Sequence, residues 1–155
     1  MRNRLTLAII PAAALAALWA FPSPRGAEEA SAQNAPGVPI SGCRVTDGDT
    51  VRCGDERIRL LGIDAPELPG HCRRGRTCAP GDPHASTASL RAALERGPLT
   101  ILRTGTDRYG RTLATMRAES EDLSCWQLRS GMAIYRADWD DGAHVRNTCP
   151  GVARP

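Results

Sequence analysis

The stretch DGDTVRCGDERIRLLGIDAPE, residues 47–67, decides the fold. Asp47-Gly48 separates two short runs of β-prone residues, and Asp-Gly between such runs is a strong hairpin signal. A second tight turn at Gly54-Asp55 leads into a run in which Ile58 and Leu60 alternate with arginines. Alternation of this kind is typical of a half-buried strand. The stretch therefore predicts a three-stranded meander over residues 40–45, 50–53 and 57–63.

The sequence after the meander predicts a helix, two strands and a second helix. In DPHASTASLRAALERG, residues 82–97, Asp82 suits the N-cap, Pro83 the first turn and Gly97 the end of a helix. Further strands are expected over 98–103 and 111–116, and the second helix over 122–129. This order predicts an α+β fold, a five-stranded OB-fold β-barrel with two flanking helices.

The first 32 residues have the layout of an export signal. Arg2 and Arg4 precede an uncharged, mostly apolar run of 17 residues, Leu5 to Phe21, and Ala30-Ser31-Ala32 then provides an A-x-A cleavage site. Cleavage is favoured, although a run of this length also allows a retained membrane anchor. We expect a signal peptide or anchor over 1–32, a linker over 33–38 and one domain over 39–155. The protein is then periplasmic or secreted.

Charge and cysteine content limit the class of protein further. Residues 33–155 contain 17 arginines and 15 acidic residues, a net charge of +2, which is too small to indicate nucleic-acid binding by itself. All six cysteines follow the signal, and an even number in an exported chain indicates disulfides. Cys72–Cys78 is the first pairing we expect, because it closes a short loop, and the other pairings stay open. Zinc is disfavoured because the usual paired cysteine spacing is absent.

Three charged motifs stand out: DGDT at 47–50, RLLGIDAPE at 59–67 and DRYGR at 107–111. Singly, they have ordinary explanations as a hairpin turn, a strand end before proline and a polar loop with a solvated ion pair. Together they predict one site, because a meander can bring Asp49, Asp64 and Glu67 to one rim. Oxygen ligands without histidine or thiol select calcium or magnesium. Arg59 and Arg111 beside such a cation would hold a phosphodiester.

In these three motifs and their order, the chain resembles the staphylococcal nuclease family, also called thermonucleases, over about residues 40–135. The resemblance implies an OB-fold barrel and calcium-dependent hydrolysis of DNA and RNA to products with a 3′-phosphate. It also implies that Asp49 and Asp64 ligate calcium together with the backbone carbonyl of Ala65, where threonine is common in the family. Asp47 and Thr50 are expected beside these ligands, without contacting the metal themselves.

The resemblance implies roles for five further side chains. Glu67 matches the general base that activates the attacking water, and Arg59 and Arg111 match the arginines that stabilise the phosphate in the transition state. Arg108 and Tyr109 match a basic and aromatic pair that contacts the neighbouring phosphate. The chain departs from the family at residues 70–81, where a Cys- and Arg-rich loop replaces the usual lysine-bearing one.

Two other functions are compatible with the same residues. The main alternative to a nuclease is a nucleic-acid-binding module on the same barrel without catalysis, and the intact set of carboxylates and arginines favours the enzyme. A disulfide-stabilised adaptor would leave that set unexplained. Tyr135 and Trp139 could form a wall on which a base stacks. Packing is the favoured interpretation, with Tyr135 against the barrel and Trp139 near Cys125 and Cys149. DNA and RNA are the expected partners of a monomer, and no protein partner is implied.

Overall fold

The computed structural model describes residues 37–154. The predicted signal segment, 1–32, and residues 33–36 of the predicted linker lie outside the described residues. The first strand begins at Val38, where the predicted linker ends. Within the described part, no helix is both long and apolar enough to cross a bilayer.

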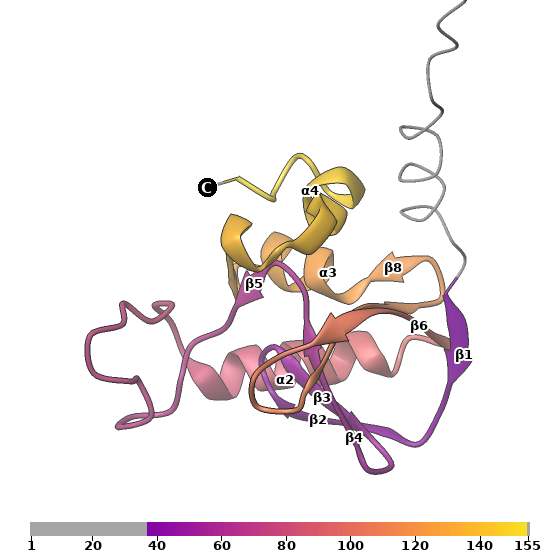
Figure 1. Cartoon of the computed structure of the whole chain (residues 1–155), viewed down its shortest axis with the longest axis horizontal. Coiled ribbons are helices and arrows are strands. Elements are labelled where there is room, and N and C mark those ends of the chain that lie inside the picture. Colours follow the sequence, from indigo (N-terminus) through magenta and orange to yellow (C-terminus); the bar gives the residue numbers. More distant parts are fainter. Residues whose placement is uncertain (1–36, 155) are drawn as a thin grey trace, which may run out of the picture.

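A mixed sheet of seven strands forms the body of the fold (Figure 1). Its strands are β1 (Val38–Ile40), β2 (Cys43–Asp47), β3 (Thr50–Cys53), β4 (Glu56–Leu60), β6 (Leu99–Thr106), β7 (Thr112–Ala118) and β8 (Glu121–Asp122). They are ordered β1-β6-β7-β4-β3-β2, and β8 also pairs with β7. Only the β4–β7 pair is parallel among the described pairs. A second, two-stranded sheet joins β5 (Ile63–Asp64) to β9 (Ile134–Tyr135).

The helices begin where the sequence provides caps. The Asp82 side chain accepts hydrogen bonds from the backbone N–H groups of His84 and Ala85, and Pro83 opens the helix. Asp122 caps the next helix by accepting from the N–H of Cys125. The α-helices are α2 (Pro83–Leu94), α3 (Leu123–Arg129) and α4 (His144–Thr148), and two 3-10 turns, η1 (Ala137–Trp139) and η2 (Asp141–Ala143), precede α4.

The α+β class and the order of the longest strands agree with an OB-like fold, but the predicted count of five strands and two helices is not confirmed. β1, β5, β8 and β9 have two or three residues each and α4 has five, too few for hydrophobic periodicity to reveal them. The edge strands of the sheet are β1 and β2, and the described residues include no pairing between these two. The sheet is therefore a half-barrel.

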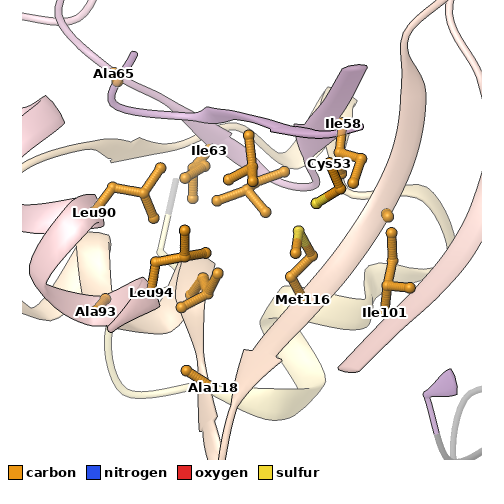
Figure 2. Close-up of a cluster of buried hydrophobic side chains, with 14 of the residues drawn as sticks. Cys53, Ile58, Ile63, Ala65, Leu90, Ala93, Leu94, Ile101, Met116 and Ala118 are labelled. Atoms are coloured by element: carbon orange, nitrogen blue, oxygen red, sulfur yellow. The ribbon is translucent and has the colours of Figure 1, made fainter. Parts of the chain in front are cut away.

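The hydrophobic core fixes the strands that carry the charged motifs (Figure 2). Arg59 lies on β4 between Ile58 and Leu60, which are 0% and 1% exposed. Burying each of these two side chains stabilises the fold by roughly 2 kcal/mol. In the antiparallel register of β3 and β4, Arg59 lies opposite Thr50. Burial of the neighbouring side chains thus holds Arg59 beside the turn that contains DGDT.

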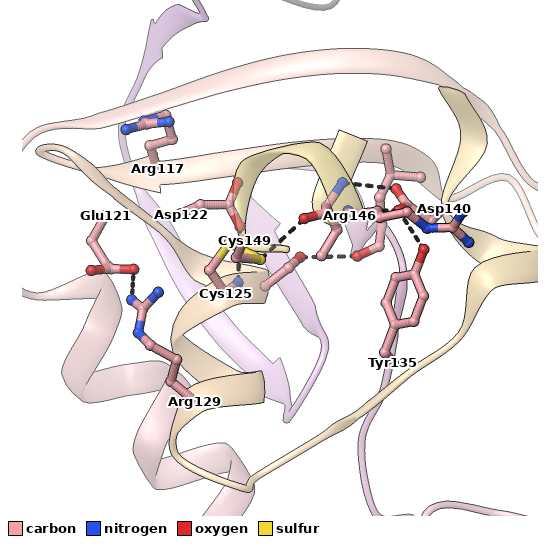
Figure 3. Close-up of a disulfide and its surroundings, with 12 residues drawn as sticks. Arg117, Glu121, Asp122, Cys125, Arg129, Tyr135, Asp140, Arg146 and Cys149 are labelled. Carbon is pink, nitrogen blue, oxygen red and sulfur yellow. Dashed lines mark hydrogen bonds and ion pairs between the residues drawn. A yellow bond between two sulfur atoms is a disulfide. The ribbon is translucent and has the colours of Figure 1, made fainter. Parts of the chain in front are cut away.

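All six cysteines form disulfides, which leaves no thiolate for a zinc site. The predicted Cys72–Cys78 pair is confirmed and closes a loop between β5 and α2. Cys43 and Cys53 lie directly opposite each other on β2 and β3. Cys125–Cys149 connects α3 to the residue that follows α4 (Figure 3), and it belongs to the same buried cluster as Tyr135. This last bridge holds the C-terminal segment against the body of the protein.

Candidate functional site

An open cleft of about 1470 Å³ contains eight of the ten predicted site residues. This volume exceeds the roughly 300–1,000 Å³ of typical small-molecule pockets and suits an extended ligand. Both positively and negatively charged residues line the cleft. The arginines are Arg57, Arg59, Arg73, Arg76, Arg108 and Arg111, and the acidic residues are Asp47, Asp49, Glu67, Asp107, Asp138, Asp140 and Asp141. The remaining two predicted residues, Thr50 and Asp64, are buried and contact residues that line it.

Asp49 lies in the turn between β2 and β3 and is 8% exposed. Its Oδ1 lies 2.5 Å from Nη1 of Arg59 and accepts a 3.1 Å hydrogen bond from the Thr50 hydroxyl. Its Oδ2 accepts a 2.8 Å hydrogen bond from the backbone N–H of Ala65. Burial raises the pKa of Asp49 to about 6, and Asp47 adds to the rise while the Arg59 charge opposes it. Asp49 is thus a buried carboxylate with one buried cationic partner.

Gly48 allows this turn to pack directly on α2. A Cβ atom at this position would lie 2.0 Å from Oγ of Ser86 and 2.6 Å from Cβ of Ala65, so only glycine fits. The carbonyl oxygen of Gly48 accepts a 2.7 Å hydrogen bond from Nε2 of Gln127, a fully buried residue of α3. Sequence reasoning explained Gly48 by the hairpin alone and missed Gln127, because nothing local in the chain indicates which helix packs on the turn.

Asp64 is fully buried at the end of β5. Its Oδ1 forms an ion pair with Arg76 and lies 4.0 Å from Nη2 of Arg59. Its Oδ2 is buried and has no hydrogen-bond partner among the described residues. Arg59 also donates to the backbone oxygens of Asp49 at 3.3 Å and Ile63 at 3.0 Å. The Arg59 guanidinium thus lies between the two carboxylates predicted to bind calcium.

Glu67 is brought to the same cleft but is bound to an arginine that the sequence did not predict. Its side chain is 37% exposed, and its Oε1 lies 3.2 Å from Nη1 of Arg76. Arg76 belongs to the loop closed by Cys72 and Cys78. The Cys- and Arg-rich composition of this loop departs from the family pattern. Composition alone does not predict which carboxylate an arginine of the loop will contact.

The DRYGR segment connects β6 to β7 and holds a cluster of arginines around one tyrosine. Asp107 accepts from the backbone N–H groups of Tyr109 and Arg111 and forms a 2.7 Å ion pair with the Arg111 side chain. The Tyr109 hydroxyl accepts hydrogen bonds from Arg108 at 2.7 Å and Arg73 at 2.5 Å. The hydrogen bond from Arg108, and then that from Arg73, lowers the pKa of Tyr109. Because the tyrosine is 45% exposed, the cluster is accessible from the cleft.

The two aromatic residues after α3 have different positions. Tyr135 is buried, as the packing interpretation predicted, and donates a 2.8 Å hydrogen bond to Asp140. Trp139 lines the cleft instead of the disulfide region. The guanidinium carbons of Arg59 and Arg76 lie 5.3 and 5.0 Å from the centre of its ring. Both distances are within the range of cation–π attraction, so the ring supports the arginines that contact Asp49 and Asp64.

The residues at this site fit a hard cation in chemistry, but their present arrangement does not leave it room. Asp49 and Asp64 provide oxygen atoms, and Oδ2 of Asp64 is a buried acceptor without a partner in the described chain. However, both oxygens of Asp49 accept hydrogen bonds, and Arg76 holds Asp64 and Glu67. In residues 37–154, no three His, Cys, Asp or Glu side chains are grouped so that they could bind a metal. Arg76 occupies Oδ1 of Asp64 and Oε1 of Glu67, so a cation could reach these two oxygens only after Arg76 leaves.

Comparison with known proteins agrees with the motifs. A family model described as staphylococcal nuclease homologue matches residues 57–148. This range includes the three residues predicted to be catalytic, Arg59, Glu67 and Arg111. The match begins after Asp49 and therefore does not cover that aspartate. The chain is also 37% identical over 111 residues to the succinoglycan biosynthesis protein ExoI of Rhizobium meliloti (strain 1021). The alignment covers 69% of this chain and 58% of that relative. With a family match over more than half of its length, the chain belongs to the staphylococcal nuclease family.

Proposed function

We propose that this protein is an exported, calcium-dependent nuclease that hydrolyses phosphodiester bonds of DNA and RNA and leaves 3′-phosphate products. One observation carries the proposal. Arg59, Glu67 and Arg111 line the same cleft as Asp49, although they come from three separate motifs. A carboxylate and two arginines around one extended cleft suit a phosphodiester better than a neutral ligand.

In the proposed reaction, Glu67 accepts a proton from the attacking water, which forms a bond to phosphorus as the bond to the 5′ oxygen breaks. The leaving oxygen takes a proton from solvent. Arg59 and Arg111 donate to the non-bridging oxygens, on which negative charge grows as water attacks. Calcium held by Asp49, Asp64 and the Ala65 carbonyl would supply further stabilisation of that charge.

Substrate binding is proposed for the Tyr109 cluster. Arg108 and Tyr109 lie in the same exposed turn as Arg111 and line the same cleft. A phosphate next to the one being cleaved would replace part of the hydrogen bonding that now joins Arg108 to the tyrosine hydroxyl. Asp47 and Thr50 act on Asp49, through a 3.2 Å hydrogen bond from the Asp49 N–H to Asp47 and through the Thr50 hydroxyl.

We further propose that residues 1–32 direct export and that residues 39–155 are the nuclease domain, a monomer in the periplasm or outside the cell. Three disulfides support an oxidising compartment, because such bonds are rare in the cytosol.

A second candidate function is a nucleic-acid-binding module without catalysis. The contact between Arg76 and Glu67 favours it, because the guanidinium occupies the Glu67 oxygen that would otherwise face the attacking water. The relative from Rhizobium meliloti is named for succinoglycan biosynthesis, and that name alone does not decide between the two functions.

The deciding experiment incubates the oxidised protein with single-stranded DNA and, separately, RNA, in calcium, in magnesium and in chelator. We expect cleavage in calcium, none in chelator, and 3′-phosphate ends identified by mass spectrometry. Binding without cleavage in every metal would instead support the binding module. Neither binding nor cleavage would reject both functions.

A further inference from the structure

Arg76 is bound to two carboxylates that have roles in the proposed function, one as a calcium ligand and one as the general base. Its two terminal nitrogens contact Asp64 and Glu67, one carboxylate each. The side chain is 28% exposed, and its Nε is buried without a hydrogen-bond partner among the described residues. The Trp139 ring lies 5.0 Å from the guanidinium. Arg76 is thus held by its charged tip and by an aromatic surface.

The charge balance explains why a cation lies at this position. Asp64 is 0% exposed, and a buried carboxylate needs a partner of opposite charge. Arg59 lies 4.0 Å from Asp64 and is engaged with Asp49 at 2.5 Å, so it serves Asp64 only in part. Arg76 therefore provides the main compensating charge for Asp64.

The loop around Arg76 keeps it close to the carboxylates. Cys72–Cys78 closes a segment with a sequence separation of only 6 residues, and this covalent constraint limits how far the arginine can move. In the same loop, Arg73 donates to the Tyr109 hydroxyl at 2.5 Å. The loop thus contacts both halves of the cleft, the carboxylates through Arg76 and the arginine cluster through Arg73.

We propose that Arg76 is an internal cation that competes with a divalent metal ion for Asp64 and Glu67. The guanidinium and a metal ion cannot both occupy Oδ1 of Asp64 and Oε1 of Glu67, so a metal that uses these two oxygens requires Arg76 to leave. Release of Arg76 also frees Glu67. This inference rests on the proposed function to the extent that the site binds a divalent cation.

Calcium binding to the purified, oxidised full-length protein tests this competition by isothermal titration calorimetry, without an activity assay. Arg76→Gln should bind calcium at least tenfold more tightly than the wild type, because nothing then has to be displaced. Arg74→Gln is the matched control, since it removes the same charge from an exposed position in the same loop. It should bind calcium within twofold of the wild type.

Two further measurements distinguish a change in calcium affinity from a loss of folding in the variant. Removal of Arg76 leaves Asp64 without its main partner, so Arg76→Gln should melt at a lower temperature than the wild type without calcium and gain more on its addition. Arg76→Lys keeps the charge but lacks the two-pronged tip, and its calcium affinity should be intermediate. Equal or weaker calcium binding in both Arg76 variants would overturn the competition, as would absence of calcium binding in all proteins.

Nuclease assays on the same variants separate this inference from the proposed function. Tighter calcium binding by Arg76→Gln without cleavage would support the competition and reject the nuclease. Calcium-dependent cleavage with an affinity that does not depend on Arg76 would support the nuclease and reject the competition.

Discussion

The Arg59 guanidinium lies 2.5 Å from the Asp49 carboxylate, and both residues are 8% exposed. A buried ion pair of this kind differs from a surface one, because removal of one partner leaves a charge that water cannot reach. Arg59 therefore has a structural function in addition to the catalytic one proposed for it.

Arg59→Ala should lower the free energy of unfolding by about 3–5 kcal/mol at pH 7, the usual cost of breaking a buried pair. Urea denaturation followed by circular dichroism measures this change. The control is Arg111→Ala, whose ion pair with Asp107 is partly exposed and should contribute less than about 1 kcal/mol. Equal effects of the two substitutions would mean that the Arg59 pair is no more stabilising than a surface pair.

Arg111→Ala should nevertheless reduce cleavage about 100-fold, the usual effect of removing one donor to a transition-state oxygen. The loss should appear in kcat, measured on a short single-stranded DNA at saturating concentration. Arg103→Ala serves as the control, because this arginine pairs with Glu56 away from the residues that line the cleft. Wild-type kcat in Arg111→Ala would remove Arg111 from the mechanism.

Local signals predicted the parts of this fold that depend on neighbouring residues. Asp47-Gly48 with alternation around Ile58 gave the meander, and Asp82 with Pro83 gave the start of α2. The short strands β5 and β9 were not predicted, since two residues carry no periodicity. Their pairing depends on a contact between segments about seventy residues apart.

The candidate site, like the fold, was predicted only in part. Its carboxylates and arginines lie in three motifs whose order is informative, and the structure brings them to one cleft. Arg76 was not assigned there, and Trp139 was placed there only by the less favoured interpretation. The positions of both depend on how a disulfide loop and the segment after β9 fold over the cleft. A sequence motif identifies the functional residues of a strand or turn. The contacts of a loop residue depend on tertiary packing, which the motif does not contain.

Glu67→Gln should reduce kcat by about 10²–10⁴-fold, the contribution typical of a general base. Because the Glu67 side chain is 37% exposed, the substitution should leave the melting temperature nearly unchanged. Asp138→Asn is the matched control, since it neutralises another carboxylate that lines the cleft and pairs with an arginine, Arg136. Full activity in Glu67→Gln would exclude the base assignment.

Gly48→Ala should destabilise the protein by about 1–3 kcal/mol, as overpacking does in a tight core. The new Cβ would lie 2.0 Å from Oγ of Ser86, so the turn with Asp49 must move away from α2. Gly105→Ala is the control, because a Cβ at that position meets nothing within 4 Å. Chemical denaturation of both variants measures the difference, and equal stability would mean that the turn can shift without cost.

The pair of Glu56 and Arg103 gives a pH dependence whose sign follows from its geometry. Two hydrogen bonds of 2.7 Å join the side chains, and the bond from Arg103 lowers the pKa of Glu56 from 4.5 to about 2. A carboxylate with a lowered pKa stabilises the folded state fully above its unfolded pKa and loses this effect as the pH falls through the folded one. The pair should therefore contribute at pH 7 and weaken between pH 4.5 and 2.

A double-mutant cycle of Glu56→Gln and Arg103→Gln, followed by thermal unfolding at several pH values, measures this contribution directly. Because both side chains are partly exposed, the coupling at pH 7 should be at most about 1 kcal/mol. It should fall as the pH approaches 2, where Glu56 becomes protonated and loses its attraction for the guanidinium. A coupling that stays constant from pH 7 to pH 2 would mean that packing of the two side chains, and not charge, joins β4 to β6.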